Sequence, residues 1–267
     1  MANTIFFAWQ LDTPSSENKQ PIWNAVCEAA ASLESPGDPL LSPRPESDTQ
    51  GASGTPNIVE TIFRRIRECS LFVADVTFVT ETAGGRKSPN PNVLLELGYA
   101  AHSIGWARTI LVMNRAKGGP DQLPFDILQH RWPIEFRLTE NTKARARRFE
   151  SLRDALVAAF SECESHMLSR ARDMARSIDT ATLALVAEHE NSELIPMPLP
   201  GKTMGEILVQ THRLPAYRHL LNIGAITVTN VPTIGYRWTA DGRRMIAAIH
   251  ELNPRLLQVA KNPPRRE

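Results

Sequence analysis

The chain has 267 residues, of which 42% are apolar and 22% are charged. This balance is typical of a globular protein and excludes a wholly disordered, collagen-like or coiled-coil chain. Thirty basic and 29 acidic side chains give a formal net charge of +1, so no bulk charge indicates binding to nucleic acid or to a membrane.

The cysteines and the N-terminus favour a protein of the reducing cytosol. Cys27, Cys69 and Cys163 are far apart and form no CxxC pair, so neither a disulfide framework nor a zinc site is predicted. The seven histidines show no metal-ligand spacing, and we expect no metal. The first residues, MANTIFFAWQLDT, lack the basic region and long apolar run of a secretion signal. No apolar run approaches the ~20 residues that span a membrane, so we expect a cytoplasmic protein.

The first half of the chain alternates between strand and helix patterns. Helices are predicted to begin at Pro21, at Thr55-Pro56 and at Asn90-Pro91, the last running to about residue 105. Residues 34–54 and 78–90 are predicted to be loops. Continuous apolar runs predict buried strands at residues 4–9, 70–77 and 109–114. This alternation predicts an α/β fold with a doubly wound, mostly parallel sheet, in which ligands bind beyond the carboxyl ends of the strands.

The second half predicts a long helix followed by a small module. Residues 142–189 contain no Pro or Gly, and apolar residues recur at helical spacing, so we predict one long or once-broken helix, with Ser177 or Asp179 capping a fresh start. The tail predicts short helices at 203–211 and 215–221, a β-hairpin at 225–229 and 236–238, and a final helix at 239–252. This order, with its TxxGR pattern after the hairpin, resembles a winged helix.

The charge changes at the Pro-rich stretch near residues 196–201. Residues 1–200 carry 20 basic and 25 acidic side chains, whereas residues 201–267 carry 10 basic and 4 acidic ones. We therefore predict a first domain at 1–140, a helical connector at 141–200 and a winged-helix-like domain at 201–267. Docking of a protein or signal molecule is the favoured role of the tail, and DNA binding is the alternative. The basic residues considered for a DNA-binding face are Arg213, Arg218, His219, Arg237, Arg243 and Arg244.

The helix after Asn90 carries the most informative polar pattern. At about 100° per residue, Asn92, Glu96 and Tyr99 fall on one face beside an apolar stripe. Glu96 is therefore expected at the edge of the core-facing surface, near the mouth of the sheet. A partly desolvated carboxylate there can stabilise positive charge that develops on a substrate. The alternative is an ordinary solvated glutamate on a helix surface.

Four blocks of the first half resemble the bacterial TIR-like family in order and spacing, over about residues 4–137. They are IFFAWQLDTPSSENKQPIWNAV, DTQGASGTPNIVETIFRRI, LFVADVT and NPNVLLELGYA. The wider superfamily cleaves N-glycosidic bonds with one helix glutamate, and by this resemblance that role falls on Glu96. The resemblance implies an NAD glycohydrolase that binds NAD as its substrate, needs no cofactor and acts in bacterial defence when self-association activates it. It thus also implies a homo-oligomer.

Further residues near the predicted crevice are candidates for substrate binding. Asp75 at a strand end is either a general acid or a residue that accepts bonds from nearby backbone N–H groups. Phe7 and Trp9 either stack on a ring or pack in the core. The remaining candidates are Asp12, Gly51, Gly54, Ser88, Asn92 and Tyr99. Two other functions remain open: a nucleotide-binding sensor that regulates transcription without turnover, and a nucleoside deoxyribosyltransferase-like enzyme.

Overall fold

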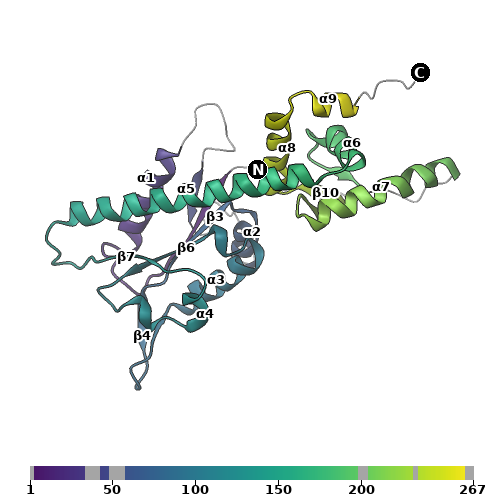
Figure 1. Ribbon diagram of the computed structural model, residues 1–267. Coiled ribbons are helices and arrows are strands. Elements are labelled where there is room, and N and C mark those ends of the chain that lie inside the picture. Colours follow the sequence, from purple (N-terminus) through teal and green to yellow (C-terminus); the bar gives the residue numbers. More distant parts are fainter. Residues whose placement is uncertain (1–2, 34–42, 48–57, 198–203, 231–233, 262–267) are drawn as a thin grey trace. The chain divides into compact units, whose positions relative to one another are not determined.

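The computed structural model of the chain describes residues 3–33, 43–47, 58–197, 204–230 and 234–261 (Figure 1). The chain forms two compact units, Met1–Glu164 and Ser165–Glu267. The division falls within the long helix α5, whereas the change in charge lies near residues 196–201.

The first unit is built on a five-stranded parallel sheet in the order β2-β1-β3-β6-β7. Its strands are β1 (Thr4–Ala8), β2 (Arg44–Ser47), β3 (Leu71–Asp75), β6 (Thr109–Asn114) and β7 (Ile134–Phe136). All residues of β3 and β6 are buried, as their continuous apolar runs predict. The predicted α/β class with a parallel sheet is therefore confirmed.

Two segments that were predicted to be loops contain strands. Part of the stretch 34–54 forms β2, which pairs with β1 at the edge of the sheet. Its sequence, RPES, is polar because an edge strand needs little burial, so no apolar run marks it. Part of the stretch 78–90 forms a separate two-stranded hairpin, β4 (Phe78–Glu81) with β5 (Lys87–Pro89). Gly85 has a φ of 77° in the connecting turn, a conformation that favours glycine.

Helices and short helical turns surround the sheet of the first unit. They are α1 (Lys19–Ser32), α2 (Ile58–Glu68), α3 (Pro91–Ser103), the short α4 (Phe125–Leu128), the 3-10 turns η1 (Trp106–Arg108) and η2 (Pro120–Gln122), and α5 (Arg145–Ser177). Helices α2 and α3 pack against each other. Ile66 of α2 and Leu97 of α3 join Phe6, Phe72 and other sheet residues in one core cluster. Side chains alternate along a strand, so Phe7 lies on the other face, where it stacks on Trp23 of α1.

The second unit contains a three-stranded antiparallel sheet in the order β8-β10-β9 and the helices around it. Its elements are α6 (Thr180–His189), β8 (Ile195–Pro196), α7 (Met204–Asn222), β9 (Ile226–Thr229), β10 (Gly235–Trp238), α8 (Ala240–Leu252) and α9 (Leu256–Lys261). The predicted hairpin is confirmed as β9 and β10, and the helix predicted at 239–252 is confirmed as α8. That helix is not the final one, because α9 follows it. The once-broken helix is also confirmed, because α5 ends at Ser177 and Asp179 caps α6 by accepting a bond from the Thr182 N–H at 2.7 Å.

The prediction of two short helices near residues 203–221 is wrong. A single helix, α7, spans them, with Pro215 inside it. A proline inside a helix removes one backbone hydrogen bond and costs about 3 kcal/mol, which is why the sequence predicts a break there. Ala216, Tyr217 and Leu220 are buried in the core of this unit, and their packing offsets that cost. No helix in the described ranges is both long and apolar enough to cross a membrane.

Candidate functional site

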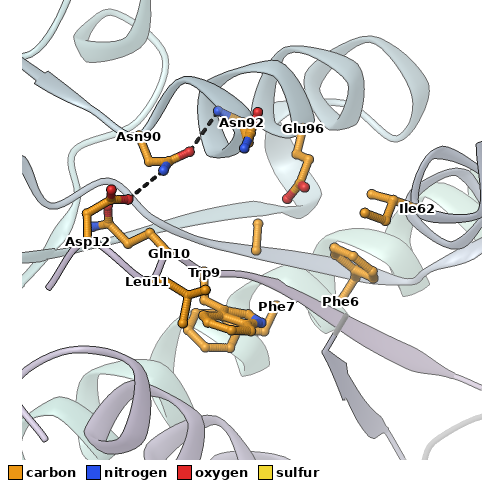
Figure 2. Close-up of a pocket in the computed structure, with 11 residues that line it drawn as sticks. Phe6, Phe7, Trp9, Gln10, Leu11, Asp12, Ile62, Asn90, Asn92 and Glu96 are labelled. Carbon is orange, nitrogen blue, oxygen red and sulfur yellow. Dashed lines mark hydrogen bonds between the residues drawn. The ribbon is translucent and has the colours of Figure 1, made fainter. Parts of the chain in front are cut away.

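A pocket of about 310 Å³ lies where β1 ends and α3 begins (Figure 2). Its position beyond the carboxyl end of β1 is the one that a parallel sheet predicts for a ligand site. The residues that line it come from β1 and the segment after it, from α2 and from the start of α3. They are Phe6, Phe7, Ala8, Trp9, Gln10, Leu11, Asp12, Ile62, Asn90, Asn92 and Glu96.

Glu96 lies on the second turn of α3 and lines this pocket. Helix α3 buries Val93, Leu97 and Ala100 against the core, and this packing fixes the rotation of the helix. Glu96 borders that apolar stripe and is half-buried. Figure 2 shows its carboxylate pointing away from the helix toward the residues at the end of β1. The carboxylate is therefore held on a rigid element, at the edge of the core, with access to the pocket.

The start of α3 is fixed by Asn90, which caps the helix and also contacts the segment after β1. The Asn90 Oδ1 accepts hydrogen bonds from the N–H groups of Asn92 at 2.8 Å and Val93 at 3.3 Å. Its Nδ2 donates to the Asp12 carboxylate at 2.6 Å. Figure 2 draws the bonds of Asn90 to Asn92 and to Asp12. Asp12, predicted as a substrate contact, thus lines the pocket and holds the capping residue of the helix that carries Glu96.

The two aromatic candidates at the end of β1 differ in exposure. Phe7 is 0% exposed and its ring stacks on Trp23, with centroids 6.2 Å apart. Although Phe7 borders the pocket, its ring belongs to the core. Trp9 is half-buried, and the Lys19 ammonium nitrogen lies 3.1 Å from the centroid of its ring. A cation over an indole face is a stabilising contact that fixes the ring orientation. Trp9 is therefore the more accessible aromatic surface of the two.

Asp75 is buried in a hydrogen-bonded network and does not line the pocket. Its carboxylate accepts bonds from Asn18 Nδ2 at 3.0 Å, from the Thr77 N–H at 3.0 Å and from Gln10 Nε2 at 3.3 Å. Burial raises the pKa of Asp75 above its ordinary value, and the hydrogen bonds partly oppose this rise. Because Asn18 begins α1 and Gln10 follows β1, the network fastens both segments to the end of β3.

The other predicted contacts lie away from the pocket or outside the described residues. Tyr99 stacks on Phe63 of α2, with ring centroids 4.2 Å apart, and its hydroxyl accepts a bond from Arg67. Ser88 lies in β5 and donates to the carbonyl of Pro89. Neither residue lines the pocket, although Asn92 does. Gly51 and Gly54 lie outside the described residues.

Six lining residues were not predicted as contacts: Gln10, Leu11, Ile62, Phe6, Ala8 and Asn90. The first two directly follow β1 at its carboxyl end, and this position is a signal from which they were predictable. Ile62 belongs to the core-facing side of α2, and nothing in its local sequence distinguishes a residue at a pocket from one in the core. Among the residues that the structure describes, no group of three or more Cys, His, Asp or Glu side chains is arranged to hold a metal ion.

In the second unit, several arginines considered for a DNA-binding face are engaged within the unit. Arg213 pairs with Glu188 at 3.1 Å, and the buried Arg244 pairs with Asp241 at 3.6 Å. Arg243 donates to the backbone carbonyls of Glu190 and Ser192. Burial lowers the pKa of the Arg243 guanidinium. These three side chains therefore bond to groups of their own unit. This favours a structural role for them over contacts with the phosphates of DNA.

Comparison of the chain with models of known protein families and with curated protein sequences found no match.

Proposed function

We propose that the first unit is a TIR-like NAD glycohydrolase that cleaves the bond between nicotinamide and ribose, with Glu96 as its catalytic residue. The observation that carries the proposal is the position of the Glu96 carboxylate, which points into a pocket beyond the end of a parallel strand. The same pocket holds the half-buried ring of Trp9, a surface for a flat aromatic group.

A carboxylate in this position suits the chemistry of NAD cleavage. The nicotinamide ring of NAD is a cation, and it takes the electrons of the glycosidic bond and leaves as a neutral molecule without a proton. The ribose carbon is left with oxocarbenium character. The Glu96 carboxylate would stabilise that positive charge or capture the carbon covalently. Attack by water, with loss of its proton, then gives ADP-ribose, whereas attack from within the substrate gives a cyclic product.

The pocket favours this substrate over a nucleoside with a neutral base. A neutral base leaves readily only when a general acid protonates it. The two carboxylates among the lining residues are Asp12 and Glu96, and Asp12 accepts a hydrogen bond from Asn90. Asp75, the residue considered for the acid, is buried in its own network. A leaving group that needs no proton therefore suits the site better.

By the same resemblance, we propose that the activity serves bacterial defence and rises on self-association. In that scheme the second unit docks a protein or a signal molecule. The engagement of Arg213, Arg243 and Arg244 within the unit supports docking over DNA binding.

The test is to incubate the purified full-length chain with NAD at several protein concentrations and to follow the products by chromatography. We expect nicotinamide release, with ADP-ribose or its cyclic form as the second product. Glu96→Gln removes the charge at nearly constant shape, and we expect it to lower the rate by about 10²–10³. Glu162→Gln on α5 is the matched control, because the Glu162 side chain is 79% exposed and does not line the pocket.

Three outcomes would contradict the proposal. One is the absence of nicotinamide release at every protein concentration, and another is turnover by Glu96→Gln at the rate of the unaltered chain. The third is an equal loss of activity in Glu96→Gln and Glu162→Gln, which would indicate a general effect of removing charge.

A further inference from the structure

Strand β9 is an outer strand without the features that normally protect a sheet edge. Exposed edges are usually blunted by charged residues or prolines, because an unprotected edge pairs with other strands. The sequence of β9 is ITVT, which has neither. The other outer strands of the described sheets all carry a charge, a proline or both: β2 (RPES), β4 (FVTE), β5 (KSP), β7 (IEF) and β8 (IP).

The hydrogen-bond pattern of the hairpin fixes which groups of β9 face outward. The Thr239 N–H donates to the Ala225 carbonyl at 3.0 Å, so these two residues occupy a hydrogen-bonded position of the ladder, although the Ala225 N–H itself donates to Leu220. Hydrogen-bonded and non-hydrogen-bonded pairs alternate along an antiparallel ladder, and Thr227 lies opposite Arg237 in a hydrogen-bonded pair. The N–H and C=O groups of Ile226 and Val228 therefore point away from β10, toward the open edge.

Apolar side chains extend beyond the covered part of the same hairpin. Ile226 and Trp238 lie opposite each other and are buried in the core of the unit. Val228 lies two residues further on the same face of the sheet, yet it is 54% exposed. Ile234, next to β10, is 63% exposed. The apolar face of the hairpin thus continues toward its tip, past the residues that the helices cover.

We infer that β9 pairs with β9 of a second copy of this chain, antiparallel and about a twofold axis at Thr227. In this register, Ile226 lies opposite the partner subunit's Val228, and Val228 lies opposite the partner subunit's Ile226. Both outward-facing residues then exchange hydrogen bonds, four in all for the two pairs by the geometry of an antiparallel ladder. The two three-stranded sheets become one continuous sheet, and the pairing does not depend on what the pocket binds.

A second copy suits this edge better than a different partner for two reasons. The same two residues supply donors and acceptors for both halves, so the pattern is complementary to itself. The strand also carries no charge, so a symmetric pairing places no like charges opposite each other. Val228 is covered in the process, which removes apolar surface from water.

Cysteine cross-linking tests the register in the full-length chain. In the inferred pairing Thr227 faces the partner subunit's Thr227 in a non-hydrogen-bonded pair, with Cα atoms about 4.5 Å apart, within the range of a disulfide. We expect mild oxidation to convert Thr227→Cys into a covalent dimer. Thr229→Cys is the matched control, because Thr229 lies on the same strand and the same face as Thr227. In the inferred pairing it is far from the partner subunit's Thr229 across the twofold axis. Equal cross-linking of the two variants, or none in Thr227→Cys, would overturn the inference.

The solution mass of the unaltered chain and of Val228→Pro supplies an independent measurement. The Val228 N–H points away from β10, so proline there removes a bond to the partner and leaves the hairpin ladder intact. We expect a dimer by light scattering for the unaltered chain and a monomer for Val228→Pro at the same concentration. A monomeric unaltered chain, or a folded Val228→Pro that stays dimeric, would overturn the inference. If circular dichroism shows Val228→Pro to be unfolded, the cysteine pair, which leaves the backbone unchanged, decides.

Discussion

The Asn90 side-chain amide links the Asp12 carboxylate, 2.6 Å away, to the first turn of the helix that carries Glu96. Asp12 follows β1, and Asn90 lies 78 residues later in the chain. One side chain thus satisfies an N–H at the start of α3 and sets the position of that helix against the end of β1. Asp12 thus bonds the capping residue of the helix on which Glu96 lies.

Loss of Asp12 should lower activity more than stability. In Asp12→Ala, Asn90 still caps α3, but it loses the contact that orients it, and Glu96 shifts with the helix. We expect NAD turnover to fall by up to about 10²-fold, the loss that a misplacement of 1 Å can cause. Because Asp12 is exposed, the free energy of unfolding should change little. Both quantities are measurable on the same preparation, by nicotinamide release and by urea unfolding.

Substitutions of Asn90 separate its two bonds. Asn90→Ala removes the cap and should cost about 1 kcal/mol of stability as well as activity. Asn90→Ser keeps a capping oxygen but has no amide to reach Asp12, so it should resemble Asp12→Ala. Full activity in Asn90→Ser would show that the Asp12 contact has no role in the reaction.

Trp9 and Phe7 should respond differently to truncation. If the Trp9 ring stacks on the substrate, Trp9→Ala should raise KM by an amount that corresponds to about 1–3 kcal/mol, the contribution of one aromatic stack. Trp9→Phe should retain most of the affinity. Phe7→Ala removes a fully buried ring and should cost about 3–5 kcal/mol of stability instead. Steady-state kinetics beside thermal unfolding distinguish the two, and an unchanged KM in Trp9→Ala would exclude the stacking role.

Two helical glycines should respond to alanine with opposite signs. A Cβ on Gly242 in α8 would overlap the backbone carbonyl of Ala225, which cannot rotate away. We expect Gly242→Ala to destabilise the second unit by about 1–3 kcal/mol or more. A Cβ on Gly98 in α3 would meet nothing within 4 Å, so Gly98→Ala should stabilise the first unit by up to about 1 kcal/mol. Denaturation of both variants followed by circular dichroism checks the signs, and a stabilised Gly242→Ala would contradict the close approach.

Asp75 should make stability depend on pH in an unusual direction. Burial raises its pKa in the folded state above the ordinary 3.8, so the folded state binds this proton more tightly than the unfolded state. The contribution of Asp75 to stability is therefore fully present below pH 3.8 and is lost as the pH rises through the folded-state pKa. Urea unfolding of the unaltered chain and of Asp75→Asn over this range measures it. We expect the unfolding free energy of the unaltered chain to fall relative to that of Asp75→Asn as the pH rises. A difference between the two that stays constant would contradict this.

Local sequence determined the elements whose own residues are buried or capped. The apolar runs predicted β3 and β6, because a central parallel strand is buried on both faces and must be apolar throughout. The Asn90-Pro91 start predicted α3, because a capping amide and a first-turn proline stabilise a helix start wherever it lies. Helical spacing then placed Glu96 beside the apolar stripe, and the structure has it there.

Tertiary structure decided what depends on contacts between distant residues. The polar β2 became a strand because β1 offered it a hydrogen-bonding edge, and its own residues carry no such signal. Helix α7 continued through Pro215 because the residues after the proline are buried in a core. Tyr99 shares a helix face with Glu96, yet stacking on Phe63 turns it away from the pocket. Asp12 met Asn90, and Asp75 met Asn18, only once the sheet had brought their segments together. Hydrophobic periodicity describes one helix or strand at a time, whereas these contacts depend on how the strands and helices are arranged in space.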